Sequence, residues 1–151
     1  MTSIVTLAFL HHAVAFLLVA VVTVELVLMR ELTLTTARSL VRMDAVYGVA
    51  ALAILVIGFL RVFYTEKGSA YYFHSIPFIV KIALFAIVGL LSIYPTKQYL
   101  SWRKSLKENR VPAVDDRVRR KIRMILHIEL TLLFLMMLCA AMMARGVGVF
   151  S

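Results

Sequence analysis

Long apolar stretches alternate along the chain with short charged segments. The four apolar stretches run over residues 4–29, 44–64, 72–95 and 122–144, and each reaches the roughly 20 residues with which an α-helix crosses the hydrocarbon core of a bilayer. The pattern predicts an all-α integral membrane protein that forms a four-helix bundle. The first stretch is interpreted as a helix of the mature chain and not as a signal peptide, because no basic residue precedes it and two histidines lie inside it.

The largest segment outside the apolar stretches follows the third of them. Its sequence is YLSWRKSLKENRVPAVDDRVRRKIRM. The run predicts that the third helix continues past residue 95 toward 110, that the chain breaks at Val111 and Pro112, and that the fourth helix covers 115–144. We therefore expect one domain, residues 1–151, with four transmembrane helices.

Basic residues gather in two of the three connections between the helices. The second connection holds only Lys67, beside Glu66. The first carries Arg30, Arg38 and Arg42, and the third carries Lys97, Arg103, Lys104, Lys107, Arg110, Arg117, Arg119, Arg120, Lys121 and Arg123. Because basic loops stay on the cytoplasmic side, this bias predicts an N-out/C-out topology.

The composition agrees with lipid as the main solvent. Of the 151 residues, 62% are hydrophobic, and the mean hydropathy of +0.92 is too high for a small water-soluble domain. A net charge of +9 would suggest nucleic acid as a partner of a soluble protein, but here the basic loops explain it. We expect the lipid bilayer as a partner and no nucleic acid, with Tyr99 and Trp102 at the headgroups of the inner leaflet.

Eight ionisable residues lie inside the predicted spans. Each costs on the order of a few kcal/mol near the middle of a membrane, so each requires a physical reason. At about 1.5 Å of rise per residue, they fall into an outer and an inner layer. The outer layer contains His11, His12, Arg61, His74 and Lys81, and the inner layer contains Glu25, His127 and Glu129.

Helical phase indicates which outer residues can face the bundle interior. His11 shares a face of the first helix with Glu25, whereas His12 lies on a different face, beside small alanines. Either histidine could face inward, and the sequence does not choose between them. On the third helix, His74, Lys81 and Ser92 lie on one polar stripe.

In the inner layer, Glu129 is the better interior residue of the fourth helix, because His127 lies nearly opposite and near the cytoplasmic boundary. Glu25 and Glu129, with Asp44 and His127 at the rim, could relay protons or hold a divalent cation. The alternative is that the two glutamates pair with arginines and fix the register of the helices. The arginines available for such pairs are Arg30, Arg42 and Arg123.

Four runs of sequence carry a resemblance to a known family. They are LHHAVAF, MDAVYGVAALAILVIGFLRVF, EKGSAYYFHSIPFIVKIALF and LLSIYPT. Over nearly the whole chain they resemble a bacterial family of predicted four-helix membrane proteins, domain of unknown function 2214, which brings no established activity. More distantly, a histidine in the first helix and a lysine in the third resemble the pattern of the four-helix, heme-containing protoporphyrinogen oxidases and of the copper-resistance D membrane domain.

The distant resemblance implies heme b in the outer half of the bundle, with His11 or His12 in the place of the histidine and Lys81 in the place of the lysine. The chain departs from the oxidase pattern in its doubled histidine, its short second connection and its paired inner glutamates, which leaves the substrate open. Independently, imidazole is a normal axial ligand of heme iron, so His74 is a third candidate ligand. Arg61, Lys67 or Arg145 near the outer surface would bind a propionate.

The sequence therefore supports one main hypothesis, a membrane b-type heme protein in electron transfer or in oxidation of a lipophilic substrate. It leaves open whether the protein is an enzyme. The alternatives are a cofactor-free small transporter or proton- or ion-coupled accessory subunit built on Glu25 and Glu129, and a structural protein of a homo-oligomer or larger membrane complex. In each case we expect a multi-pass protein of the bacterial inner (cytoplasmic) membrane.

Overall fold

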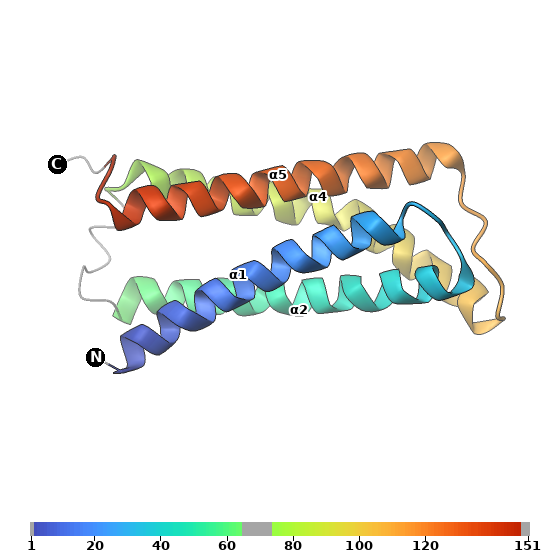
Figure 1. The fold of residues 1–151 in the computed structure, drawn as a ribbon, viewed down its shortest axis with the longest axis horizontal. Helices are drawn as coiled ribbons and strands as arrows, with labels where there is room; N and C mark the ends of the chain where they lie inside the picture. The colour runs from blue at the N-terminus through green and yellow to red at the C-terminus, as the bar shows by residue number, and fades with distance from the viewer. Residues whose placement is uncertain (1, 65–73, 149–151) are drawn as a thin grey trace.

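The computed structural model describes residues 2–64 and 74–148, and over these ranges the chain forms four helices (Figure 1). Their bounds are α1 Thr2–Leu28, α2 Leu34–Tyr64, α4 Ile76–Lys107 and α5 Asp116–Ala144. All four are long and apolar enough to cross a membrane. The all-α, four-helix membrane fold predicted from the apolar stretches is confirmed.

The helices form an antiparallel bundle. The start of α1 and the end of α5 lie at one end of it, which we call the terminal end, and the connections α1–α2 and α4–α5 lie at the other, the loop end (Figure 1). α1 packs mainly against α2 and α4 mainly against α5, with smaller contacts between α2 and α4 and between α1 and α5. The order around the bundle is therefore α1, α2, α4, α5, and α1 faces α4 across the diagonal.

Large apolar side chains cover the outside of the bundle. Examples are Phe9, Val49, Leu90 and Phe134, one from each helix, all of which are more than half exposed. A water-soluble protein rarely exposes apolar surface on every side, so hydrocarbon chains are the solvent of this surface.

The helices differ from the predicted spans at their ends. α2 begins at Leu34, ten residues before the apolar stretch starts at 44, because its first turns lie at the loop end, where Arg38 and Arg42 reach water or headgroups. α4 starts at Ile76 and not at 72, since residues 74 and 75 are not helical; 72 and 73 lie outside the described residues. α5 starts at Asp116, one residue after the predicted start at 115, because Asp115 is the residue whose carboxylate caps the helix.

The third helix passes Pro95, as predicted, but it ends at Lys107, short of residue 110. It ends there because Asn109 takes a left-handed conformation with φ of 54°, in which an α-helix cannot continue. The Asn109 side chain accepts a hydrogen bond of 2.5 Å from Arg38 Nη2, which connects the start of α2 to the end of α4.

Most residues of the buried apolar core lie in the loop half of the bundle. Tyr99 and Trp102, on successive turns of α4, are 0% and 4% exposed, and their ring centroids are 5.0 Å apart. The prediction that placed these two residues at the headgroups is wrong. Their rings face the other helices and not the membrane surface, because the bundle continues beyond the apolar stretch of α4.

Candidate functional site

The terminal half of the bundle contains a pair of nitrogen-bearing side chains that meet across the diagonal. His11 projects from α1 and Lys81 from α4, and the Lys81 Nζ lies 3.3 Å from the His11 Nε2. His11 is 9% exposed. Because α1 and α4 are not neighbours in the bundle, the two side chains cross its interior to make this hydrogen bond.

All four helices contribute to the surroundings of this pair. On α2, a Cβ added at Gly58 would lie 3.6 Å from His11 Cε1, so the imidazole packs close to the α2 backbone. Arg61, one turn further along α2, interacts electrostatically with both His11 and Lys81. Its Nε is buried and has no hydrogen-bond partner among the described residues. From α5, Cys139 lies within electrostatic range of Lys81.

The other two histidine candidates lie apart from this pair. His12 is exposed on the outside of α1, and its Nδ1 is 2.7 Å from the Ala8 carbonyl oxygen of the same helix. His74 precedes α4 and is exposed. The sequence left open which histidine of the first helix faces inward, and the structure places His11 there.

The loop half contains a second polar group, which we call the acidic layer: Glu25 of α1, Asp44 of α2 and Glu129 of α5. Glu25 and Glu129 are 3% and 2% exposed, and Glu25 interacts electrostatically with both other carboxyl groups. Asp44 is partly exposed and accepts a hydrogen bond of 2.6 Å from Thr96 Oγ1 of α4. The acidic layer therefore joins side chains from three helices inside the bundle.

Two tyrosines face the acidic layer. Tyr47 of α2 and Tyr99 of α4 both interact electrostatically with Glu25 and Glu129. The Tyr99 hydroxyl is fully buried, and within the described residues it has no hydrogen-bond partner. Sequence reasoning did not assign Tyr99 to a site, although it lies 18 residues, or five turns, from Lys81 on the same stripe of α4.

The arginines expected to pair with the glutamates do not do so in the described parts of the chain. The ion pairs found there join Arg110 to Glu108 and Arg119 to Asp116, both at the loop end. The Oε1 atoms of Glu25 and Glu129 have no hydrogen-bond partner among these residues. His127 lies outside the acidic layer, because it is exposed and its Nδ1 is 2.7 Å from the Arg123 carbonyl oxygen.

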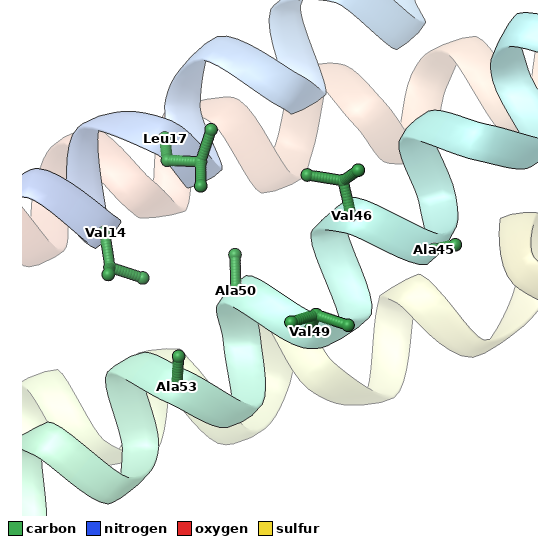
Figure 2. A pocket seen from close by; sticks show the side chains of 7 residues that line it. All are labelled: Val14, Leu17, Ala45, Val46, Val49, Ala50 and Ala53. Carbon is green, nitrogen blue, oxygen red and sulfur yellow. The ribbon is translucent and has the colours of Figure 1, made fainter.

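Two surface grooves lie apart from both polar groups. One, of about 370 Å³, lies between α1 and α2 and is entirely apolar (Figure 2). The other, of about 380 Å³, lies at the loop end beside Trp102 and Asp115. The residues that line the first groove are Val14, Leu17, Ala45, Val46, Val49, Ala50 and Ala53. A groove of this composition, open to the outside of a membrane bundle, suits a lipid acyl chain.

Comparison with known proteins identifies a family and no activity. A family model described as a predicted membrane protein, DUF2214, matches residues 3–148. No curated protein and no solved structure matches the chain. Across residues 2–64 and 74–148, no group of three or more His, Cys, Asp or Glu side chains is placed to hold a metal ion.

Proposed function

The chain belongs to the DUF2214 family of predicted membrane proteins, and we propose that it binds b-type heme in the terminal half of its bundle, where His11 and Lys81 would hold the iron. In this proposal the protein transfers electrons or oxidises a lipophilic substrate within the membrane. The observation that carries it is the contact between His11 Nε2 and Lys81 Nζ across the diagonal.

The donor atoms suit a heme iron. Imidazole is a normal ligand of heme iron, and the His11 Nε2 and the Lys81 Nζ, 3.3 Å apart, are two nitrogen atoms that meet in the bundle interior. Both side chains are fixed on long transmembrane helices and would hold the iron if they moved apart to admit it.

Two residues of α2 near the His11–Lys81 pair suit the binding of a heme macrocycle. Gly58 has no side chain, so the α2 backbone lies close to the His11 ring. The partly buried Arg61 side chain, whose buried Nε lacks a partner among the described residues, is a hydrogen-bond donor suited to a propionate. The side chains around the line from His11 to Lys81 have to move apart to admit the ring.

Each residue then has a defined task. His11 and Lys81 would hold the iron, and the Lys81 amine has to be free of its extra proton to act as a ligand. Arg61 would balance the charge of a propionate. Bound heme supplies one-electron chemistry, and the apolar bundle around it excludes water and sets its potential.

We further propose that the loop end faces the cytoplasm of a bacterial inner membrane. The basic residues of two connections lie at this end, and positively charged loops are retained on the cytoplasmic side. The His11–Lys81 pair then lies in the outer half of the bilayer. A redox partner, or a second copy of the chain in a homo-oligomer or larger complex, would approach it laterally through the exposed apolar surface.

The test is an oxidised-minus-reduced absorption spectrum of protein purified from heme-replete cells. We expect a Soret band and sharp reduced α and β bands in the unmodified chain and in His12→Ala, the exposed neighbour that serves as matched control. His11→Ala and Lys81→Ala should lose or strongly shift these bands while eluting as folded protein in detergent. A folded, heme-free unmodified chain would contradict the proposal and favour the cofactor-free alternatives.

A further inference from the structure

The buried carboxyl groups of the acidic layer need to be neutralised, and heme binding in the other half of the bundle does not neutralise them. Glu25 and Glu129 are 3% and 2% exposed inside a bundle surrounded by hydrocarbon, and each has an Oε1 without a hydrogen-bond partner among the described residues. Transfer of an unpaired carboxylate into such surroundings is very costly. These side chains therefore require a neutralising partner, which is either a bound cation or a proton.

The groups around the layer come from every helix of the bundle. Three acidic or phenolic side chains, Asp44, Tyr47 and Tyr99, each interact electrostatically with both glutamates. Among the described residues, Arg103 acts on the rim of the layer, where it attracts Asp44. By helix, the set is Glu25 of α1, Asp44 and Tyr47 of α2, Tyr99 and Arg103 of α4, and Glu129 of α5. Glu25 and Glu129 thus face acids and phenols and no basic side chain of the set.

The Tyr99 hydroxyl is a further buried polar group of the layer. Its hydroxyl is 0% exposed and, as far as the described residues show, has no partner, although it lies in range of all three carboxyl groups. A phenol both donates and accepts, so it can bond to a carboxylic acid or to a carboxylate. Since no group of three acidic or histidine side chains among the described residues is arranged to hold a metal ion, the geometry favours a proton over a cation.

Asp44 is the partly exposed member of the layer. It accepts a hydrogen bond from Thr96 Oγ1 and interacts electrostatically with Arg103. Both buried glutamates, Glu25 and Glu129, interact electrostatically with Asp44. Asp44 therefore links the two buried carboxyl groups to a more accessible one.

We propose that the acidic layer is a proton-binding site, in which Asp44 takes a proton from water at the loop end and passes it to Glu25 or Glu129. A carboxylate oxygen accepts the proton from hydronium, which leaves water, and becomes a carboxylic acid. When the proton returns to water, the carboxylate forms again. Proton binding by the acidic layer does not depend on heme binding, because the layer contains no atom of the His11–Lys81 pair.

The experiment is a pH-difference infrared spectrum of the full chain in lipid nanodiscs. We expect a carbonyl band of protonated carboxylic acid at neutral pH that shifts in D₂O and disappears at alkaline pH. Each of Glu25→Gln and Glu129→Gln should lower the band, and the double variant should remove it. The matched control, Glu31→Gln, changes an exposed glutamate of the α1–α2 connection and should leave the band unchanged.

The unmodified chain alone shows whether a protonated carboxylic acid is present at neutral pH, so this result does not depend on whether the variants fold. Absence of the protonated-acid band at neutral pH would overturn the proposal. Loss of the band on addition of sodium or potassium chloride at fixed pH would also overturn it, because a bound cation would then displace the proton. Tyr99→Phe should shift the frequency of the band, and His11→Ala should retain it, whether or not heme binds.

Discussion

Lys81 and Tyr99 lie on one face of α4, 18 residues and therefore five helical turns apart, so the same stripe of this helix enters both polar groups of the bundle. Lys81 reaches His11 in the terminal half, and Tyr99 faces the carboxyl groups in the loop half. At about 1.5 Å per residue, the two positions are separated by about 27 Å along the helix. α4 thus fixes the distance between the proposed heme and the proposed proton site.

Gly58 provides a test of how closely α2 packs against His11. A Cβ at this position would make ordinary contact at 3.6 Å, so Gly58→Ala should bind heme as the unmodified chain does. Gly58→Leu should displace the imidazole and lower the heme-to-protein ratio, measured from the Soret absorbance. Gly48→Leu is the control, because a Cβ at Gly48 meets no atom within 4 Å. Equal heme content in both leucine variants would contradict the packing described.

The ring and the hydroxyl of Tyr99 should make separate contributions to stability. Tyr99→Ala removes a fully buried ring that packs on Trp102, and we expect it to lower the free energy of unfolding by about 3–5 kcal/mol. Tyr99→Phe retains the ring and removes only the hydroxyl, whose proposed hydrogen bond with the acidic layer contributes about 1 kcal/mol, so the loss should be much smaller. Denaturation in mixed detergent micelles measures both. A loss in Tyr99→Phe as large as in Tyr99→Ala would show that the hydroxyl makes a strong hydrogen bond.

The fold could be predicted from the sequence because a membrane imposes a length on apolar helices. Residues 4–29, 44–64, 72–95 and 122–144 were sufficient to define four spans. The ends of the helices were predicted less well, since a helix does not end where its hydrocarbon environment ends. α2 continues ten residues beyond its apolar stretch because helical hydrogen bonds are equally satisfied among headgroups and in water.

For the candidate site, the sequence indicated which residues could face the interior, but it did not show which of them contact one another. Helical phase put both His11 and Lys81 among the interior candidates, but His11 and His12 could not be separated, because the choice depends on how α1 rotates against Gly58. Tyr99 was assigned to the headgroups because it stands among basic residues. Only the packing of α4 against the other helices shows that these basic side chains point outward and Tyr99 inward.

The contact between Arg38 and Asn109 should stabilise the loop end. Arg38 Nη2 donates to the Asn109 side chain at 2.5 Å and reaches the Leu106 carbonyl oxygen at 3.4 Å, so Arg38→Ala removes the connection between α2 and the end of α4. We expect a loss of about 1 kcal/mol in the free energy of unfolding and faster proteolysis of segment 108–115. Arg42→Ala removes an exposed arginine of the same helix and serves as control. Equal proteolysis of the two variants would contradict this role of Arg38.

The orientation of the bundle can be tested with single cysteines in a Cys139→Ala background. Val147 lies at the terminal end and is 48% exposed, and Lys107 is exposed at the end of α4, at the loop end. If the basic loop end faces the cytoplasm, a membrane-impermeant maleimide added to intact spheroplasts should label Val147→Cys and not Lys107→Cys. After lysis both should be labelled, which controls for reactivity. The reverse pattern would place the His11–Lys81 pair in the cytoplasmic half and would require the redox partner to lie on that side.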